Sequence, residues 1–268
     1  MPAFHSATSP GKIKDPKVAA ILAADGIQLD ADAAAVEFRH FGTRDDFGTS
    51  ELTVALLAGE AHETFLATNG ITHIISTSTA DITETIHLEG YTLSGGLFTR
   101  VAQDVALNGR TAVALSTPIA RVNHAVNTSA TAIAGTISVY EGGSTSLGVV
   151  DDATEVHLQI AAGRQLAEDG SAVVGDEECL VITHIMGSIL KKQAAFVDVT
   201  LESRALTGQW LHMTKFALAS TGTSSIVIVP DPPIVVEANT DIRLTAVAST
   251  TGVEVTAMMS GWRLSLQA

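Results

Sequence analysis

Cys179 and His184 are the residues of this 268-residue chain that come closest to a nucleophile and its base. A thiol deprotonated by an imidazole can attack a carbonyl carbon, provided that the two side chains reach each other. The surrounding segment has the pattern of a β-strand, in which side chains five positions apart point to opposite faces. The spacing therefore favours a buried structural cysteine over a catalytic pair. Because Cys179 is the single cysteine, an intrachain disulfide and a cysteine-rich zinc site are excluded.

The nine histidines do not form the spaced pair that a zinc finger or a zincin requires. Asp30 and Asp32 resemble the opening of a calcium loop, but its sixth position is Ala35 instead of glycine, and the later acidic ligand is missing. Phosphate-binding loops, dinucleotide fingerprints and nucleophile elbows do not occur either. We therefore expect a protein that is not an enzyme, with no catalytic residue, no cofactor and no metal ligand.

Aromatic side chains are the feature on which a carbohydrate-binding β-sandwich would depend. Trp262 alternates in phase with Leu264 and is therefore expected in the core. Trp210 follows Gly208 and Gln209 at the start of an expected strand, where it could be exposed. Aromatic residues make up only 4 % of the chain, so a core or rim position is favoured over a sugar contact.

Charge and hydropathy restrict the partners of the chain. Lys and Arg number 15 against 29 Asp and Glu, which gives a net charge of −14 and disfavours binding to nucleic acid or to an anionic membrane. Mean hydropathy is +0.30, yet no window reaches the roughly 18 apolar residues of a membrane span, and the N-terminus has no signal-peptide pattern. A chain this apolar is expected to cover part of its surface by forming a homo-oligomer.

Residues 1–62 are expected to form an extended N-terminal arm with a short helix. Asp15 and Pro16 have the residue types of a helix N-cap and first turn, and Gly26 ends the pattern. Residues 31–41 are expected to be a second helical or irregular piece. The candidate contact residues of the arm are three lysines and the apolar stripe of the helix: Lys12, Lys14, Lys17, Val18, Ile21 and Leu22.

From about residue 51 onward, short runs alternate between apolar and polar residues, as in 195–201. Such runs, separated by Gly, Asn, Asp and Ser, are typical of antiparallel sheets with one covered face, and Asn108-Gly109 is the strongest hairpin signal. The predicted fold class is all-β, an antiparallel β-sandwich of jelly-roll-like type that follows the arm. A loop at 141–148 divides a first β block, residues 63–145, from a second, jelly-roll-like block, residues 146–268. Whether the blocks form one domain or two stays open.

Several segments resemble structural proteins of tailed-phage virions, in which a Ser-rich strand leads to an L-N-G hairpin, an R-x-N strand and a G-x-I strand. The matching segments are 74–78 followed by Asp81, VALNGRTAV (105–113), IARVNHAV (119–126), AGTISVY (134–140) and IAAGRQ (160–165) before the expected strand 179–186. The chain departs from the family where residues 82–85 replace a Gly-rich stretch. It departs again at 165–167, in place of Asn-Gln-Thr, and at 174–176, in place of Pro-Ala-Gly.

The resemblance implies a virion structural protein, most specifically a capsid decoration (cement) protein that binds and stabilises the outer surface of the phage head. It implies the major capsid protein as a partner, contacted by the arm, and self-association as a homotrimer at three-fold positions of the shell. A neck, tail or head-fibre subunit is the alternative within the same class. A carbohydrate-binding β-sandwich module is the alternative from another class.

Overall fold

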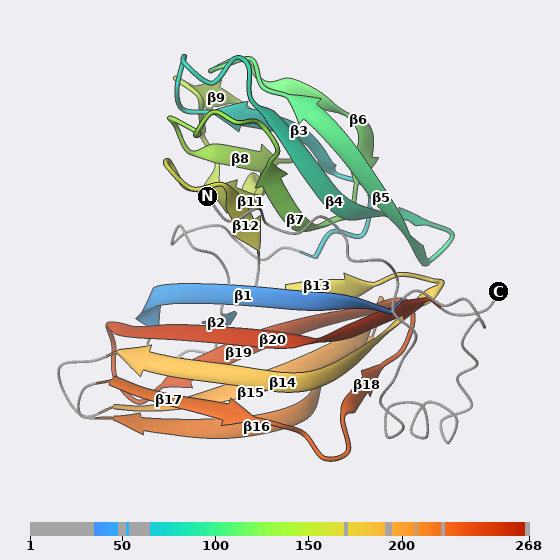
Figure 1. Cartoon of the computed structure of the whole chain (residues 1–268), viewed down its shortest axis with the longest axis vertical. Helices are drawn as coiled ribbons and strands as arrows, with labels where there is room; N and C mark the ends of the chain where they lie inside the picture. The colour runs from blue at the N-terminus through green and yellow to red at the C-terminus, as the bar shows by residue number, and fades with distance from the viewer. Residues whose placement is uncertain are drawn as a thin grey trace.

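The computed structural model describes residues 35–47, 52–53, 65–168, 171–190, 195–206, 208–220 and 223–265. Within these ranges the regular structure consists of β-strands and one short 3-10 turn, η1 (Ala153–Glu155). All strand pairings found there are antiparallel. The strands form two lobes, one above the other (Figure 1). The predicted all-β antiparallel fold class is confirmed, whereas the short helix of the arm lies outside the described residues.

The larger lobe is a jelly roll. Its main strands are β1 (Ala35–Phe47), β13 (Ser171–Val174), β14 (Glu178–Leu190), β15 (Ala195–Ala205), β16 (Leu211–Ser220), β17 (Thr223–Ile228), β19 (Thr240–Ala248) and β20 (Val253–Ser265). They form the sheets β1–β20–β14–β17 and β13–β19–β15–β16, with β18 (Ile234–Val236) added beside β14 and β2 (Leu52–Thr53) beside β19. Counted along the chain, the main strands follow the orders first–eighth–third–sixth and second–seventh–fourth–fifth, which is the double Greek key of a jelly roll.

The inward faces of these two sheets share one apolar core. On β15, Ala195, Val197, Val199 and Leu201 are buried, while Phe196, between Ala195 and Val197, points to solvent. Successive side chains of a strand point to opposite faces, so this alternation follows from the pleat. The period-two pattern that predicted a strand at 195–201 is confirmed.

The smaller lobe is inserted between β2 and β13 of the jelly roll. Its strands are β3 (Ile71–Ser76), β4 (Thr85–Ser94), β5 (Leu97–Ala106), β6 (Val113–Ile119), β7 (Arg121–Asn127), β8 (Ile137–Tyr140), β11 (Val156–Ile160) and β12 (Leu166–Glu168), with the hairpin β9 (Thr145–Ser146) and β10 (Val149–Val150). They form the sheets β11–β8–β3–β6 and β12–β7–β4–β5 around a second apolar core. If β11 and β12 are counted as the first and second strands and β3 to β8 as the third to eighth, the two sheets again have the orders first–eighth–third–sixth and second–seventh–fourth–fifth. The smaller lobe therefore has the topology of a circularly permuted jelly roll.

The Asn108-Gly109 pair makes a tight turn but not the predicted hairpin. Gly109 has a φ of 57°, and the amide of Thr111 donates to the carbonyl of Asn108. The strands on either side, β5 and β6, belong to different sheets of the smaller lobe. The turn therefore carries the chain from one layer of the sandwich to the other.

The division of the chain differs from the one that the sequence suggested. Residues 35–47, expected within the arm and in part as a helical or irregular piece, form β1, which pairs along β20 in the jelly roll. The loop 141–148 lies inside the smaller lobe, since it leads from β8 into the hairpin β9–β10. Residues 146–168, assigned to the second block, also belong to the smaller lobe.

Candidate functional site

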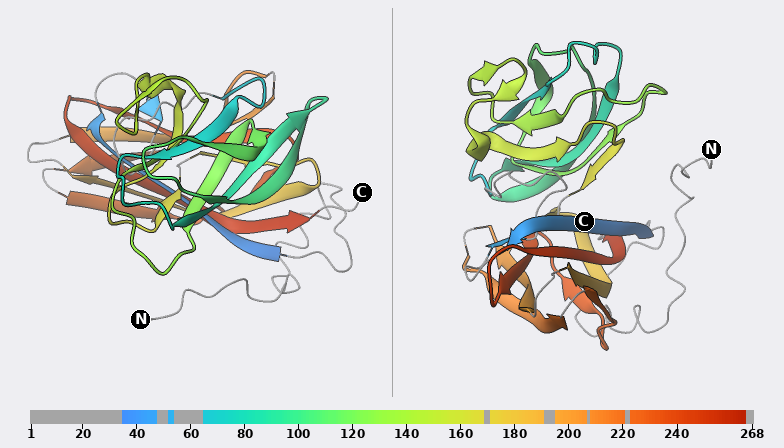
Figure 2. Two further views of the ribbon diagram at one scale, coloured as in Figure 1. Left: turned by 90° about the horizontal axis from the view of Figure 1, so that it is seen from above. Right: turned by 90° about the vertical axis from the view of Figure 1, so that its left-hand side faces the viewer.

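The junction between the lobes contains their buried ionic contact. The smaller lobe lies over the edge of the jelly roll that β1 and β13 form (Figures 1 and 2). From β7, Asn123 donates its side-chain amide to the carbonyl of Val173 on the edge strand β13, at 3.5 Å. An uncovered edge strand is a template for pairing with other chains, so the inserted lobe protects this edge.

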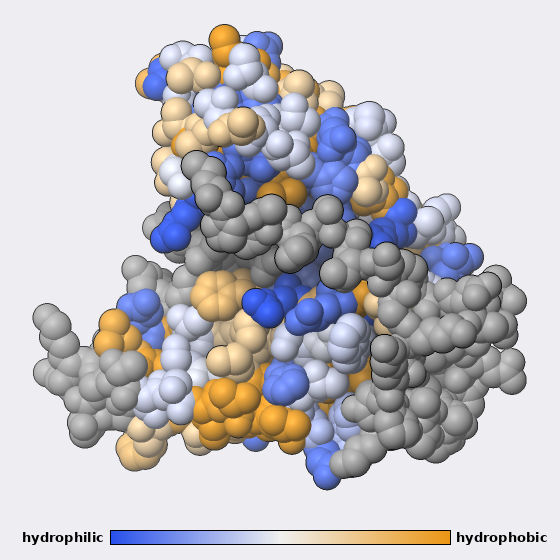
Figure 3. All heavy atoms as spheres, viewed as in Figure 1, coloured by the Kyte–Doolittle hydropathy of each residue, from blue (hydrophilic) through white to orange (hydrophobic). Residues whose placement is uncertain are grey.

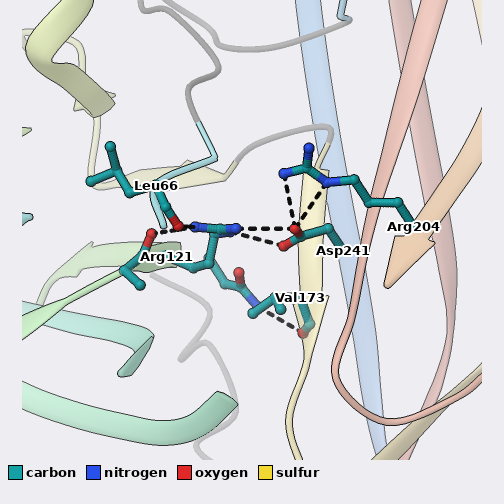
Figure 4. A network of polar contacts seen from close by, with 7 residues as sticks. Leu66, Arg121, Val173, Arg204 and Asp241 are labelled. Carbon is teal, nitrogen blue, oxygen red and sulfur yellow. Dashed lines mark hydrogen bonds and ion pairs between the residues drawn. The ribbon is translucent and has the colours of Figure 1, made fainter. Parts of the chain in front are cut away.

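Asp241 of β19 is fully buried and joins the two lobes. Its Oδ1 and Oδ2 accept hydrogen bonds from Nε and Nη2 of Arg121, on β7, at 2.8 and 3.0 Å. Arg204 of β15 donates Nε and Nη2 to the same Oδ2 at 3.3 and 3.2 Å. The Nη1 of Arg121 donates to the carbonyls of Leu66 and Ala120 at 2.7 and 2.8 Å (Figure 4). The buried carboxylate is thus paired with two guanidinium groups, as a charge without water requires.

Aromatic rings stack between the arginines of this junction. The Phe65 ring lies 5.0 Å from the guanidinium of Arg121 and 4.8 Å from that of Arg204. The Trp210 ring lies 4.6 Å from Arg204 and 4.0 Å from Arg243, and it meets Phe65 edge-on at 5.0 Å. Each such cation–π contact contributes about 0.5–2 kcal/mol. Trp210 therefore stacks in the junction and is not a free platform for a sugar.

Carboxylate pairs continue this network on the jelly-roll side. Glu202 is buried and accepts from Nε of Arg243 at 2.8 Å. His212 places its Nε2 at 2.9 Å from the other oxygen of Glu202. Arg243, which stacks on Trp210, is therefore also held by a buried carboxylate.

A second set of contacts joins the lobes beside the arginine network. The Tyr91 hydroxyl donates to Glu178 at 2.6 Å, and burial, reinforced by Glu178, raises the pKa of Tyr91. The Phe98 amide donates to Asn239 at 2.8 Å, while the Phe98 carbonyl accepts from the amide of Asp176 at 2.8 Å. Behind these bonds lies a small apolar cluster that both lobes share: Tyr91, Phe98, Ala120 and Val173. The junction thus has the composition of a folded interior.

Charged side chains line the sheet of the smaller lobe that faces the junction. Glu89 accepts from Arg100 at 2.8 Å and pairs in register with His124, and His87 contacts Asp104 at 2.7 Å. Burial opposes ionisation of Glu89, but the hydrogen bond and charge of Arg100 outweigh it, so the pKa of Glu89 is lowered. Burial lowers the pKa of His124, against the attraction of Glu89. At neutral pH this row holds a carboxylate beside a neutral imidazole.

Cys179 and His184 do not form a catalytic pair. A bulge between Ile182 and His184 brings both residues to the same face of the sheet, so the predicted opposite orientation is wrong. They are nevertheless five positions apart along β14, roughly 15 Å at the rise of a strand. Cys179 is buried, and burial followed by the charge of Glu178 raises its pKa to about 11. The thiol is therefore protonated and shielded at neutral pH.

The predicted core position of Trp262 is wrong, whereas Trp210 lies at a partly covered position. Trp262 pairs in register with Glu37 and Val181 and is 40 % exposed on the outer face of the sheet, although the core was expected. Trp210, for which exposure was considered, is half-buried in the junction. A lone exposed indole that projects from a strand does not make a sugar-binding cleft.

The described residues hold neither a metal site nor a membrane-spanning helix. Within the described residues, no three His, Cys, Asp or Glu side chains are arranged to hold a metal ion, and no helix is long and apolar enough to cross a membrane. Asp30 and Asp32 lie outside these residues. So do all the candidate capsid contacts of the arm: Lys12, Lys14, Lys17, Val18, Ile21 and Leu22.

No family model matches the chain, and no curated protein matches it. Among solved structures, it is similar to the structure of infectious bursal disease virus Gx strain, at 9 % identity over 98 % of this chain and 79 % of that chain, with a TM-score of 0.21. It is also similar to a Bacillus thuringiensis Cry1Da tryptic core variant, at 9 % identity over 82 % of this chain and 59 % of that chain, with a TM-score of 0.21. The PBSX exported protein XepA matches at 14 % identity over 84 % and 86 % of the chains, with a TM-score of 0.19. TM-scores this low carry no argument about function.

Proposed function

We propose that the protein is a structural component of a bacteriophage virion, most specifically a decoration (cement) protein that binds and stabilises the outer surface of the head. The observation that carries the proposal is the architecture: two jelly rolls held together by Asp241 and its two arginines. Jelly rolls are common in viral shell domains and in lectins. The buried pair of Arg121 and Asp241 crosses between the lobes, which suits a rigid building block.

Segments that resemble tailed-phage virion proteins meet around Asp81, which is buried in the smaller lobe. Its carboxylate accepts from the Ser76 hydroxyl at 2.5 Å and from the amides of Ala134 and Gly135 at 2.8 and 2.9 Å. Its carbonyl accepts from the amide of Gly109 at 2.7 Å. Asp81 therefore joins three of these segments: its carboxylate holds the Ser-rich run and the AGTISVY segment, and its backbone carbonyl holds the L-N-G turn. This role supports the interpretation of these segments as structural motifs.

The proposed partners are the major capsid protein and further copies of the chain in a homotrimer, without nucleic acid, membrane or cofactor. In this proposal the lysines of the arm attract an acidic shell, and the apolar stripe of the arm is buried against it. The capsid-contact residues proposed are Lys12, Lys14, Lys17, Val18, Ile21 and Leu22. An arm that becomes ordered on binding can cover a large surface at modest affinity per unit area.

Quantitative mass spectrometry of purified particles tests the proposed position in the virion. A copy number in proportion to the capsid subunits is expected for a decoration protein. A small number set by the symmetry of the portal or tail would instead indicate a neck, tail or head-fibre subunit. Absence from particles would refute the virion role, and specific binding on a glycan array would favour the carbohydrate-binding alternative.

Rebinding of the purified protein to stripped heads tests the arm. Deletion of residues 1–24 should leave the body folded and abolish attachment. Replacement of Lys12, Lys14 and Lys17 by serine should weaken attachment more at low salt than at high salt, since ions already screen these charges at high salt. Lys215→Ser, at an exposed lysine of the jelly roll, serves as the control. Undiminished binding of the truncated protein would show that the sandwich makes the contact.

A further inference from the structure

The outer face of sheet β1–β20–β14–β17 carries a row of apolar side chains that crosses all its strands. In register, Phe41 pairs with Met258, Met258 with Met186, and Met186 with Val227. These residues alternate with buried ones such as Met259, so they point away from the core. The row spans the sheet over about 15 Å at the usual spacing of strands.

Apolar side chains on this face are open to solvent. Met186 is 40 % and Val227 54 % exposed. Leu190 and Trp262 lie on the same face and are exposed to 51 and 40 %, and Val229, which directly follows β17, is exposed to 62 %. Figure 3, which views this face, shows hydrophobic residues gathered over β14 and β17. Together the five residues expose on the order of 500 Å², spread along the sheet from Trp262 to Leu190, which compares with the largest apolar patch of a typical monomer.

The face is nearly uncharged, although the chain has a net charge of −14. Glu37 and Arg39 form an exposed ion pair of their own at 3.6 Å, and Glu254 is the other acidic side chain that the described part of the face presents. Two copies of an acidic protein repel each other wherever their carboxylates meet, so they approach with least repulsion through a face like this one.

We infer that this face packs against another copy of the chain in the homo-oligomer. The inference rests on the self-association in the proposed function and assigns it a surface. In a closed trimer this face of one copy meets a different surface of the next copy, and a stable interface buries about 800 Å² per partner. The apolar row with its Ser and Thr rim provides an area of that order. An acidic shell would select a basic surface, which the arm offers and this face does not.

A matched pair of substitutions tests the inference. Val227 and Val149 are both valines exposed to 54 %, but Val149 lies on β10 of the smaller lobe. By light scattering at micromolar concentration, the wild type and Val149→Asp should exceed the 27.8 kDa monomer mass, and Val227→Asp should fall to it with an unchanged far-UV spectrum. A monomeric wild type, or a Val227→Asp variant that stays oligomeric, overturns the inference.

Thiol labelling locates the interface without a disruptive charge. The single native cysteine, Cys179, is buried and does not compete. Where nine-tenths of the protein is assembled, Val227→Cys should react about tenfold more slowly than Val149→Cys, since only the free fraction reacts. Dilution to the monomer should remove the difference. Equal rates, or protection that persists in the monomer, would show that no second copy covers the face.

The same variants distinguish this inference from the proposed virion role. A wild type that assembles through this face but does not bind stripped heads would refute the decoration role and leave the inference intact. A Val227→Asp variant that remains oligomeric but no longer binds heads would assign the face to the capsid and overturn the inference.

Discussion

Replacing Asp241 by asparagine should destabilise the protein by about 3–5 kcal/mol, the usual cost of removing one partner of a buried ion pair. Asparagine preserves the shape of the side chain but withdraws the negative charge that faces Arg121 and Arg204. Arg121 is only 7 % exposed, so its guanidinium cannot regain water in the folded state. Arg121→Met should cost less than Asp241→Asn, because Asp241 keeps its two bonds to Arg204.

Urea denaturation measures this effect, and the chain offers a matched control. Asp198 and Lys215 form a pair of the same length, 2.8 Å, but with side chains 47 and 54 % exposed. Exposed pairs contribute about 0–1 kcal/mol, so Asp198→Asn should lie within that range. If Asp241→Asn costs no more than Asp198→Asn, burial of the junction does not determine its strength, and the reasoning fails.

The same titration shows whether the junction couples the lobes. Both tryptophans, Trp210 and Trp262, belong to the jelly roll, so fluorescence follows the larger lobe, whereas far-UV circular dichroism follows both lobes. The two transitions should coincide in the wild type and separate in Asp241→Asn. Coincident transitions in the variant would mean that the remaining contacts suffice to unfold the lobes together.

Three further experiments test other parts of the structure. Because burial lowers the pKa of His124, the unfolded chain binds the proton more readily below pH 6.5, so stability should fall on acidification from there. His124→Gln should therefore flatten the melting temperature between pH 7 and pH 5, and an unchanged slope would contradict this. Gly90→Ala should cost about 1–3 kcal/mol of unfolding free energy in urea, because its Cβ would overlap the carbonyl oxygen of Arg121 and the backbone would have to shift. Gly208→Ala, whose nearest atom is at 3.3 Å, should cost less, and equal losses would refute the steric explanation. Finally, Cys179 should react with a thiol reagent at pH 8 far more slowly in the native protein than in urea, since burial raises its pKa to about 11. Rapid labelling of the native protein would show that the strand opens.

The sequence predicts the fold where a strand has one covered and one open face. β15 is such a strand, and its alternation is plain from Ala195 onward. β1 was not predicted because its inward positions include His40 and Gly42 beside Phe38, which interrupts the alternation of apolar and polar residues. Trp262 and Leu264 do lie on the same face of their strand, as the alternation predicts. The predicted core position of Trp262 is wrong because that face is buried at Leu264 and exposed at Trp262.

The junction could not be predicted because its members are remote in the chain. Arg121 and Asp241 are 120 residues apart, and Asp241 lies in none of the motifs that the sequence offers. Arg121 does fall within a segment that resembles virion proteins, but nothing local shows that its partner is a buried carboxylate. The insertion could not be predicted for the same reason. Only pairing between strands remote in the chain shows that β1 and β13, which flank the smaller lobe, belong to the same jelly roll.

The arm and the proposed interface meet at β1. Residues 1–34 lead directly into this strand, which is an edge of the sheet whose outer face we assign to a second copy. Assembly through that face would therefore place several arms on one oligomer. Once one arm is bound, the binding of each further arm is an intramolecular step, which raises the avidity of the oligomer for the shell. Basic arms on an otherwise acidic body then need only modest individual affinity. In this arrangement the junction at Asp241 would hold the smaller lobe on the jelly roll, while the sheet face would contact a second copy and the arm would contact the shell.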